Sequence, residues 1–442
     1  MYFRFEDNHD TLDYIKTIVP AAFRKIDHLF SQSELKYITY HSKTQVYHGI
    51  FHGLPKLHKN KPLDQIPFRP IIAGRPHQLQ ARVSTVLSTK LIPVLDEYPT
   101  VLKNSFELIE DLEGRLCIDH SFVSLDFESL YTSIPLLDLY STIRNCTTSN
   151  LLNYRFKEST ISILKFIFSH NYFEFAEKYY LQTDGIAMGT NVAPILANLY
   201  LAIKFDSIFQ NLDRTKYFRR FIDDCFFLYN GTQEDFENNE LLALREQAHP
   251  INITYEFNNT SVNFLDLTVY NNNDTIAFKV FQKPLNQYHY IPHFSNHPGH
   301  NLSGFIKGEL IRYKRISTQE QDFQYIKSRF YERLVKRGYP KNLLNNIFSQ
   351  ELFRQIPIEW SQLTPIQKEE IFNFAIHLSN QLRILQFLNT LFKSFAARFN
   401  LDFNNNIKIR IALKSNPNIL QLTTCSKLSR EKVALVSERL SQ

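Results

Sequence analysis

The sequence predicts a mixed α/β fold: a body of strands and helices, followed by a basic helical region. Three observations support this fold class. Short runs of β-branched and aromatic residues recur between residues 45 and 284 and predict strands. Longer segments with apolar residues at helical spacing lie between them and dominate the last third of the chain. The 442 residues, 43% of them hydrophobic, are enough for two or three structural units.

The first predicted strands lie within residues 45–75, where TQVYHGIF and FRPIIAG flank the polar segment GLPKLHKNKPLDQIP. Residues 121–127, SFVSLDF, predict a buried strand ending at Asp126. Apolar spacing then predicts helices in IPLLDLYSTIRN, STISILKFIFSH and APILANLYLAIKFDSIF (193–209). Pro194 suits the first turn of the last of these, because a backbone donor is unpaired there anyway.

A tight hairpin follows, in which the strands YFRRFI and CFFLYNG flank Asp223 and Asp224 at the turn. The alternating segments NITYEF and VNFLDLTVY, and then TIAFKVFQKP, predict one further strand each.

The last third is predicted to be helical. In DFQYIKSRFYERLVKRGYP, one apolar stripe consists of Phe323, Ile326, Phe330 and Leu334. Gly338 suits the C-cap of this helix, and Pro340 ends it. Residues Thr364 to Gln367 predict a capping box that opens another helix.

The net charge of +6 is concentrated in residues 301–340, which hold nine Lys or Arg and four acids. The basic residues are Lys307, Arg312, Lys314, Arg315, Lys327, Arg329, Arg333, Lys336 and Arg337. On charge alone, a solvated helix face explains this segment as well as polyanion binding does.

The composition favours an intracellular protein. No apolar run approaches the roughly 18 residues of a membrane span, and the start, MYFRFEDNHD, lacks the apolar core of a secretory signal. The four cysteines, Cys117, Cys146, Cys225 and Cys425, lie far apart. Their spacing fits reduced thiols, not a disulfide framework or a zinc knuckle.

The adjacent Asp223 and Asp224 stand inside the apolar run FRRFIDDCFF. Burying two such carboxylates is costly, but at a tight turn they can emerge at one edge while their neighbours stay in the core. Mg²⁺ suits such a pair, because it takes one or two carboxylates, several waters and substrate phosphates. A third carboxylate would complete a two-metal site for phosphoryl transfer, and Asp126 is the best candidate. The alternative is that Asp126 caps the following helix and the pair forms an ordinary polar turn.

Several motifs resemble those of reverse transcriptases. VSLDFESLYTSIP, QTDGIAMGTNVAPILANLYL and RRFIDDCFF, in this order, resemble the A, B and C motifs of a reverse transcriptase palm. Finer details resemble the Penelope-like retroelement enzymes. The segments that carry this second resemblance are GLPKLHKNKP, FRPIIAG, NFLDLTVY, VFQKP, SNHPGHN and KRGYP. It spans about residues 50–340, with weaker similarity through IKIRIALKSNPNI.

The resemblance implies a right-hand polymerase with fingers, an antiparallel-sheet palm and a helical thumb. Residues 1–120 would form the fingers and N-terminal region, residues 121–300 the palm with inserted fingers helices, and residues 301–442 the basic thumb and a C-terminal extension. The thumb would grip the backbone of a hybrid duplex by phosphate contacts. The segment VFQKP would brace the primer end.

The same resemblance assigns roles to single residues. Asp126 and Asp223 would be catalytic and bind both Mg²⁺ ions, with Asp224 beside them, and Mn²⁺ could replace Mg²⁺. Tyr131 would be the steric gate that rejects a 2′-hydroxyl, although it could also be a plain core aromatic.

Other residues would bind the nucleotide. Lys56 and Arg69 would contact the triphosphate, with Lys59 and Lys61 as competitors for the role of Lys56. Gly185, like Gly189, would let the backbone approach the nucleotide and template, although glycines also mark ordinary turns.

Two histidine features are less specific. Polymerases of this type are thought to protonate pyrophosphate with a general acid, often lysine, but no lysine lies between Cys225 and Lys279. His249 falls in roughly the right place, and a surface loop histidine is the simpler interpretation. The histidines His289, His293, His297 and His300 have ligand-like spacing, but no cysteine or acid nearby completes a zinc site. We interpret them as structural or phosphate-contacting.

The sequence therefore predicts an RNA-directed DNA polymerase that extends a primer 3′-hydroxyl with dNTPs on an RNA template. Its partners would be an RNA template, a DNA primer or RNA–DNA hybrid, and dNTPs, without a membrane. The resemblance implies a nuclear location. Neither the Asp-Lys-Gly motif that usually precedes GLPKLHK nor a GIY-YIG endonuclease is found, so we expect no DNA nicking by this polypeptide. The alternatives are a catalytically impaired nucleic-acid-binding remnant and an RNA-dependent RNA polymerase, against which Tyr131 argues.

Overall fold

A computed structural model describes residues 2–5, 8–40, 45–55, 62, 65–75, 77–284, 286–297 and 299–350. The chain divides into the units Met1–Gln355 and Ile356–Gln442, and all described residues belong to the first. The capping box predicted at residues 364–367 lies outside the described residues. Every helix in the described ranges is too short or too polar to cross a lipid bilayer.

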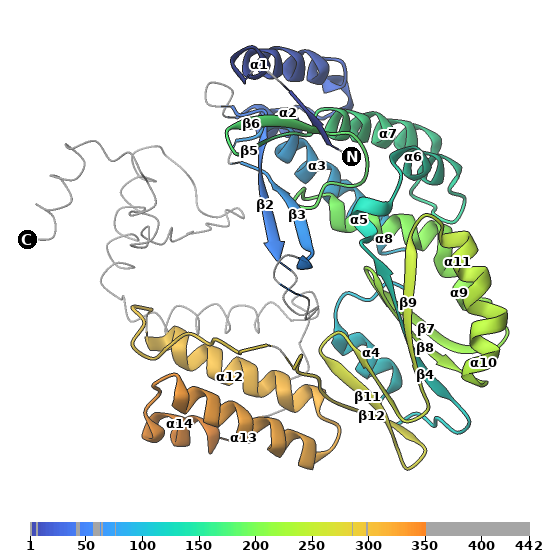
Figure 1. Cartoon of the computed structure of the whole chain (residues 1–442), viewed down its shortest axis with the longest axis vertical. Helices are drawn as coiled ribbons and strands as arrows, with labels where there is room; N and C mark the ends of the chain where they lie inside the picture. Colours follow the sequence, from blue (N-terminus) through green and yellow to red (C-terminus); the bar gives the residue numbers. More distant parts are fainter. Residues whose placement is uncertain are drawn as a thin grey trace, which may run out of the picture. The chain divides into compact units, whose positions relative to one another are not determined.

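The N-terminal part of the chain contributes to a five-stranded sheet in the order β1-β6-β5-β2-β3 (Figure 1). Its strands are β1 (Tyr2–Arg4), β2 (Gly49–Pro55), β3 (Phe68–Ala73), β5 (Tyr172–Phe175) and β6 (Lys178–Gln182). The two strands predicted within residues 45–75 are confirmed and pair antiparallel, whereas β2 and β5 pair in parallel. The pair β5–β6 joins this sheet from far along the chain, so the region is assembled from two separate segments.

A second sheet has four antiparallel strands in the order β7-β8-β4-β9. Its strands are β4 (Ser121–Glu128), β7 (Thr215–Phe221), β8 (Asp224–Tyr229) and β9 (Asn252–Asn258). In β4, Val123, Leu125 and Phe127 enter one hydrophobic core while Phe122 enters another. Because both faces are covered, this strand is rich in apolar side chains at successive positions, as predicted for residues 121–127.

Helices surround the two sheets. Those before β4 are α1 (Asn8–Arg24), the 3₁₀ turn Asp27–Leu29, α2 (Gln32–Thr39), α3 (Leu79–Leu95) and α4 (Ser105–Leu112). Those between β4 and β7 are α5 (Leu130–Ser133), α6 (Leu136–Asn145), α7 (Tyr154–Ser169), α8 (Ala193–Leu201) and α9 (Ser207–Gln210). Then follow α10 (Gln233–Asp235), a π-helical segment (Phe236–Leu241) and α11 (Leu242–Ala248), which lie beside the four-stranded sheet in Figure 1.

The helix predicted over residues 193–209 is confirmed, with Pro194 in its first turn, but it is not uniform. A π-helical segment, Ala202–Asp206, separates α8 from α9. Asp206 is the last residue of this π-helical segment and is almost fully buried.

The segment VNFLDLTVY was predicted to be one strand, and this prediction is wrong. It folds as two strands, β10 (Ser261–Phe264) and β11 (Leu267–Asn272), which pair antiparallel with each other. Leu265 adopts the left-handed conformation at the turn, with φ of 55°. A leucine at such a position gives no turn signal in the sequence. The predicted strand after it is confirmed as β12 (Thr275–Val280), which pairs with β11.

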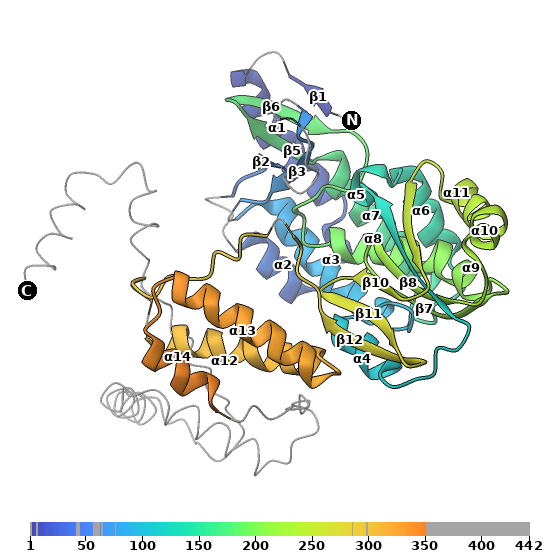
Figure 2. The same cartoon turned by 60° about the horizontal axis from the view of Figure 1, so that its bottom comes forward.

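The helical region consists of α12 (Gly299–Ile316), α13 (Glu320–Lys336) and α14 (Lys341–Phe348) (Figure 2). The stripe Phe323, Ile326, Phe330 and Leu334 is buried, as predicted. Gly338 follows α13 with φ of 85°, and the amide of Tyr339 donates to the carbonyl of Leu334, which satisfies an end carbonyl of the helix. The predicted mixed α/β fold, with an antiparallel sheet and a helical region after it, is confirmed. We use the name palm for the β7-β8-β4-β9 sheet and the name thumb for the helices α12–α14.

Candidate active site

The strand register brings the three aspartates to one end of the palm sheet. Asp126 of β4 lies directly opposite Asp224 of β8. The predicted hairpin is present, but its turn was placed one residue too late: Phe221 pairs with Asp224, so Ile222 and Asp223 form the two-residue turn and Asp224 begins β8. The amide of Phe127 donates to the carbonyl of Asp223 over 3.2 Å, which ties this turn to β4. Two residues in directly opposite positions of an antiparallel pair are close enough for their side chains to interact.

A cavity of about 1150 Å³ opens at this end of the sheet, and all three aspartates line it. Arg69 of β3 and Tyr131 of α5 line the same cavity. The structure therefore brings together five of the seven residues predicted for the site. Gly185 is buried and is not one of the described residues that line the cavity, and Lys56 lies outside the described residues.

The carboxylates influence one another electrostatically. Burial raises the pKa of Asp224 to about 7, and the charges of Asp223 and then Asp126 act in the same direction, while Lys283 opposes them. Burial and the charge of Asp223 also raise the pKa of Tyr131, and Arg69 lowers it. The cavity thus has a concentrated negative charge on the palm side and cationic side chains around it.

This arrangement fits a divalent ion that is only partly held by protein. Among the described residues, no three or more His, Cys, Asp or Glu side chains are already placed as a complete ligand set. Mg²⁺ does not need one, because it keeps waters and accepts substrate phosphates beside one or two carboxylates. Burial and the charges of Asp223 and Asp126 raise the pKa of Asp224, and a cation at this position would relieve the repulsion between the like charges.

The glycine-containing segment 184–190 connects β6 to α8. The amide of Ile186 donates to the carbonyl of Tyr131 over 2.7 Å, and the amide of Ile72 donates to the carbonyl of Met188 over 2.7 Å. Gly189 has φ of 106°, and a Cβ atom there would lie 2.4 Å from the Ile72 carbonyl oxygen. No other residue fits at this position. This contact holds β3, which carries Arg69, next to the segment that contacts Tyr131.

Gly185 has a similar structural role, because φ is 77° and a Cβ atom would lie 2.8 Å from the Thr132 carbonyl oxygen. Its implied contact with nucleotide and template stays a prediction.

Glu128 and Lys283 also line this cavity, and sequence reasoning named neither as a site residue. Lys283 is exposed and belongs to the segment VFQKP, which was predicted only to brace the primer end. No spacing rule connects Lys283 to the distant Asp224, so only the fold could place it there. His249 is the exposed C-cap residue of α11 and is not among the described residues that line the cavity.

The histidines at 289–300 make local contacts. The ring of His289 hydrogen-bonds to the side chain of Gln287 over 2.5 Å, and His297 to Ser295 over 2.6 Å. The ring of His293 packs against Tyr339, with centroids 5.3 Å apart.

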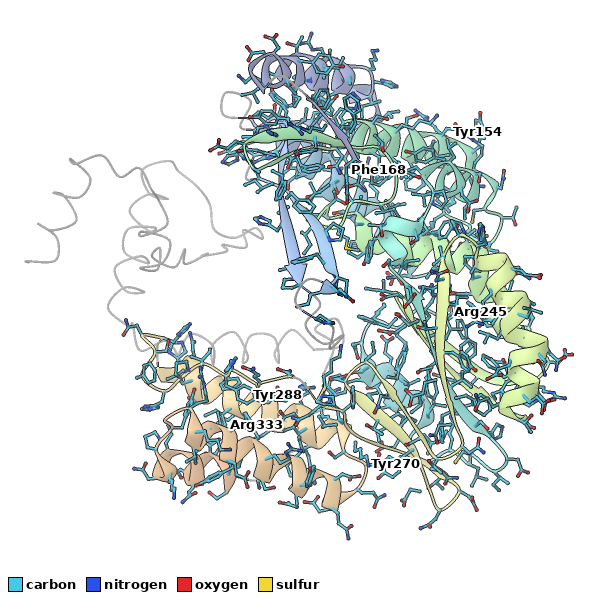
Figure 3. The ribbon with its side chains drawn as sticks, in the orientation of Figure 1. Tyr154, Phe168, Arg245, Tyr270, Tyr288 and Arg333 are labelled. Atoms are coloured by element: carbon cyan, nitrogen blue, oxygen red, sulfur yellow. The ribbon has the colours of Figure 1, made fainter. Side chains whose placement is uncertain are left out.

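Basic and aromatic side chains alternate along one flank of α13. Arg329 donates to the hydroxyl of the exposed Tyr325 over 2.8 Å. The guanidinium of Arg333 lies 3.8 Å from the centre of the Tyr288 ring, and Figure 3 shows the two side chains together on the thumb. Such surfaces are typical of proteins that bind nucleic acids. In contrast, Lys314 of α12 is paired with Glu320.

Comparisons with known proteins found one family model and several solved structures that are similar to parts of this chain. A family model described as an animal helix-turn-helix domain matches residues 289–349, the segment that contains α12, α13 and α14. No curated protein matches the chain. Telomerase from Candida albicans in complex with a TWJ fragment of telomeric RNA is 13% identical, with a TM-score of 0.46 over 70% of this chain and 58% of its own.

Two viral polymerase structures are also similar. The BmCPV RNA-dependent RNA polymerase at the elongation state is 11% identical, with a TM-score of 0.44 over 72% of this chain and 28% of its own. The Sicinivirus 3Dpol RNA-dependent RNA polymerase is 11% identical, with a TM-score of 0.41 over 72% of this chain and 70% of its own. The chain spans less than two thirds of the telomerase it matches. None of these TM-scores exceeds 0.46, too low to assign a fold or a function on its own.

Proposed function

We propose that this protein is an RNA-directed DNA polymerase of the Penelope-like retroelement type, which extends a primer 3′-hydroxyl with dNTPs. The observation that carries the proposal is the pairing of Asp126 with Asp224 across two strands, with Asp223 at the adjoining turn, in one cavity. Three carboxylates at the end of an antiparallel sheet, faced by an arginine and a lysine, suit phosphoryl transfer between nucleotides.

Each side chain has a role that follows from its chemistry. The three aspartates would hold Mg²⁺, which when bound would activate the 3′-hydroxyl and neutralise the leaving pyrophosphate. Arg69 offers a planar fork that matches phosphate oxygens, and Lys283 offers a compact cation to the same cavity. We assign both to the triphosphate of the incoming nucleotide.

Tyr131 supports the choice of DNA as product. Its half-buried ring lines the cavity close enough to Asp223 for the carboxylate charge to act on the phenol. A bulky ring on the cavity wall can exclude a 2′-hydroxyl, which a smaller side chain would admit. This is the feature that separates the proposal from an RNA-dependent RNA polymerase.

The partners follow from the thumb and from the sequence resemblance. The exposed Tyr325 and Arg329 of α13, and the half-buried Arg333 that stacks on Tyr288, suit the backbone of an RNA–DNA hybrid. The motifs from GLPKLHKNKP to KRGYP support the Penelope-like assignment, and with it a nuclear location and an RNA template.

The test is primer extension on a poly(rA)/oligo(dT) hybrid with Mg²⁺ and dTTP, with an Asp223→Asn variant as control. We expect incorporation by the natural chain and none by the variant, although the variant still binds the hybrid. Incorporation of UTP at a rate comparable to dTTP would identify an RNA polymerase. Salt-sensitive binding of the hybrid without any incorporation would identify a binding remnant, and the proposal would then fail.

A further inference from the structure

Arg220 of β7 is fully buried directly behind the catalytic turn, with 0% of its surface exposed. A guanidinium group has five N–H donors, and each one has an acceptor here. Nε and Nη2 donate to the two carboxylate oxygens of Asp206 over 2.7 and 2.9 Å. Nη1 donates to the Asn198 side-chain oxygen over 2.8 Å and Nη2 to the Asn198 carbonyl over 3.1 Å. The fifth bond runs from Nη1 to the carbonyl of Ile222 over 2.9 Å.

Arg220 and its partner Asp206 are both bonded to Thr100, which lies 106 residues before Asp206 in the chain. Asp206 ends the π-helical segment after α8, and its second oxygen also accepts from the hydroxyl of Thr100 over 2.5 Å. The backbone of Arg220 is bonded to the same loop, because its amide donates to the carbonyl of Thr100 over 2.9 Å. Asp206 and Asn198 therefore fix the position of the guanidinium group, which also donates to the turn.

The turn it reaches is strained. Ile222 adopts φ of 53°, in the left-handed region, which is a genuine outlier for a β-branched residue. Its carbonyl is held from inside by Arg220, and the next carbonyl, that of Asp223, is held by the amide of Phe127. These two bonds together define the path of the chain between the two neighbouring carboxylates.

A buried ion pair is weak evidence for added stability, because desolvation of both charges offsets their attraction. The buried pair of Arg220 and Asp206 is better explained by the backbone geometry that Arg220 imposes on the turn. A lysine could supply the charge, but it could not bond Asp206, Asn198 and Ile222 in one plane.

We propose that Arg220 is a positioning residue that fixes the Ile222–Asp223 turn, so that Asp223 and Asp224 present their carboxylates to a divalent ion in a single arrangement. The expected effect of Arg220 on catalysis rests on the proposed function. The expected effect on the affinity for a divalent ion does not, because ion binding can be measured without polymerisation.

The neighbouring Arg219 is a matched control on the same strand. Its side chain points to the opposite face of the sheet, is partly exposed, and pairs with Asp111 over 2.6 Å. Replacing it removes an arginine of the same strand without touching the turn.

The experiment measures Mn²⁺ binding to the full chain from the loss of the free-ion electron paramagnetic resonance signal. The variants are Arg220→Lys, Arg220→Gln and the milder Thr100→Val, which removes one bond to Asp206 and keeps the side-chain shape. We expect about 10-fold weaker Mn²⁺ binding in Arg220→Gln, in line with other residues that orient metal ligands, a smaller loss in Arg220→Lys and Thr100→Val, and no change in Arg219→Gln.

Primer extension by the same variants separates this inference from the proposed function. We expect kcat to fall while the KM for dTTP stays within a few fold, because Arg220 does not contact the nucleotide. If the natural chain binds Mn²⁺ but does not polymerise, the proposed function fails and the comparison of binding still stands. Folded Arg220→Lys and Thr100→Val variants with unchanged Mn²⁺ affinity would overturn the inference, as would a natural chain that binds no Mn²⁺.

Discussion

The palm end that carries the aspartates and the thumb flank on α13 use charge in opposite ways. In the palm, three acidic side chains are brought together by strand register and are half-buried, so that burial and mutual repulsion raise the pKa of Asp224 to about 7. On α13, basic side chains such as Arg329 lie exposed along a helix face and contact neighbouring aromatic rings. The palm concentrates charge at one point, whereas the thumb spreads it over a surface.

This difference predicts which substitutions should have large effects and which should have small ones. A half-buried carboxylate with like-charged neighbours acts through a short-range, weakly screened field. Exposed cations act through a screened field and contribute roughly equal, small amounts. Single changes in the palm should therefore alter chemistry, and single changes in the thumb should alter affinity.

The largest expected effect belongs to Asp224→Asn. We expect primer extension to fall by about 10²-fold or more, as when a charge-stabilising group is removed from an active site. The same variant should be more stable than the natural chain at pH 8 without divalent ions, because it removes a half-buried negative charge next to two others. Thermal unfolding in a chelating buffer measures this gain.

The pH dependence of that gain follows from the direction of the pKa shift. The ordinary pKa of the carboxyl is 3.8, and the folded state raises it to about 7. Because the folded state holds the Asp224 proton more tightly than the unfolded state, the contribution of Asp224 to the free energy of unfolding is fully present below pH 3.8. It decreases as the pH rises and is lost above a pH of about 7. We therefore expect the difference in stability between Asp224→Asn and the natural chain, in favour of the variant, to grow from pH 4 to pH 7 and then to level off. If Asp224→Asn is no more stable than the natural chain at pH 8, then burial and the neighbouring carboxylates do not destabilise the charged form of Asp224, and the prediction is wrong.

The strand and helix pattern of the palm and thumb could largely be predicted from the sequence, because periodic burial determines both. The stripe ending at Leu334 needs only the helical repeat. That Asp126 lies in the same sheet as the Asp223–Asp224 hairpin could be predicted from two apolar segments next to carboxylates, but its register opposite Asp224, and the continuation of β4 to Glu128, could not. The turn at Leu265 and the π-helical segment before Asp206 could not be predicted, since local residues give no signal for either. Lys283 and the bonds of Arg220 depend on contacts between distant segments, which no spacing in the sequence encodes.

A smaller effect is expected at Tyr131, where a substitution tests the preference of the cavity for dNTPs over NTPs. In Tyr131→Ala the carbonyl that accepts from Ile186 is retained, so the cavity wall should keep its backbone path and lose only the ring. We expect the preference for dNTPs over NTPs to fall roughly 10- to 100-fold, measured as the ratio of kcat/KM values. Tyr131→Phe keeps the ring and should keep the preference. Unchanged selectivity in Tyr131→Ala would show that the ring is only part of the core.

The smallest expected effect is that of Arg329→Gln in the thumb, measured as hybrid binding at several salt concentrations. If Arg329 neutralises one phosphate, the slope of log affinity against log salt should decrease by about 1 and affinity should drop severalfold. Lys314→Gln is the matched control, because Lys314 is already paired with Glu320 and its loss should change the slope less. With saturating hybrid, kcat of Arg329→Gln should equal that of the natural chain. A fall in kcat with an unchanged salt slope would mean that the thumb acts on the chemistry itself, and the contrast between the two regions would not hold.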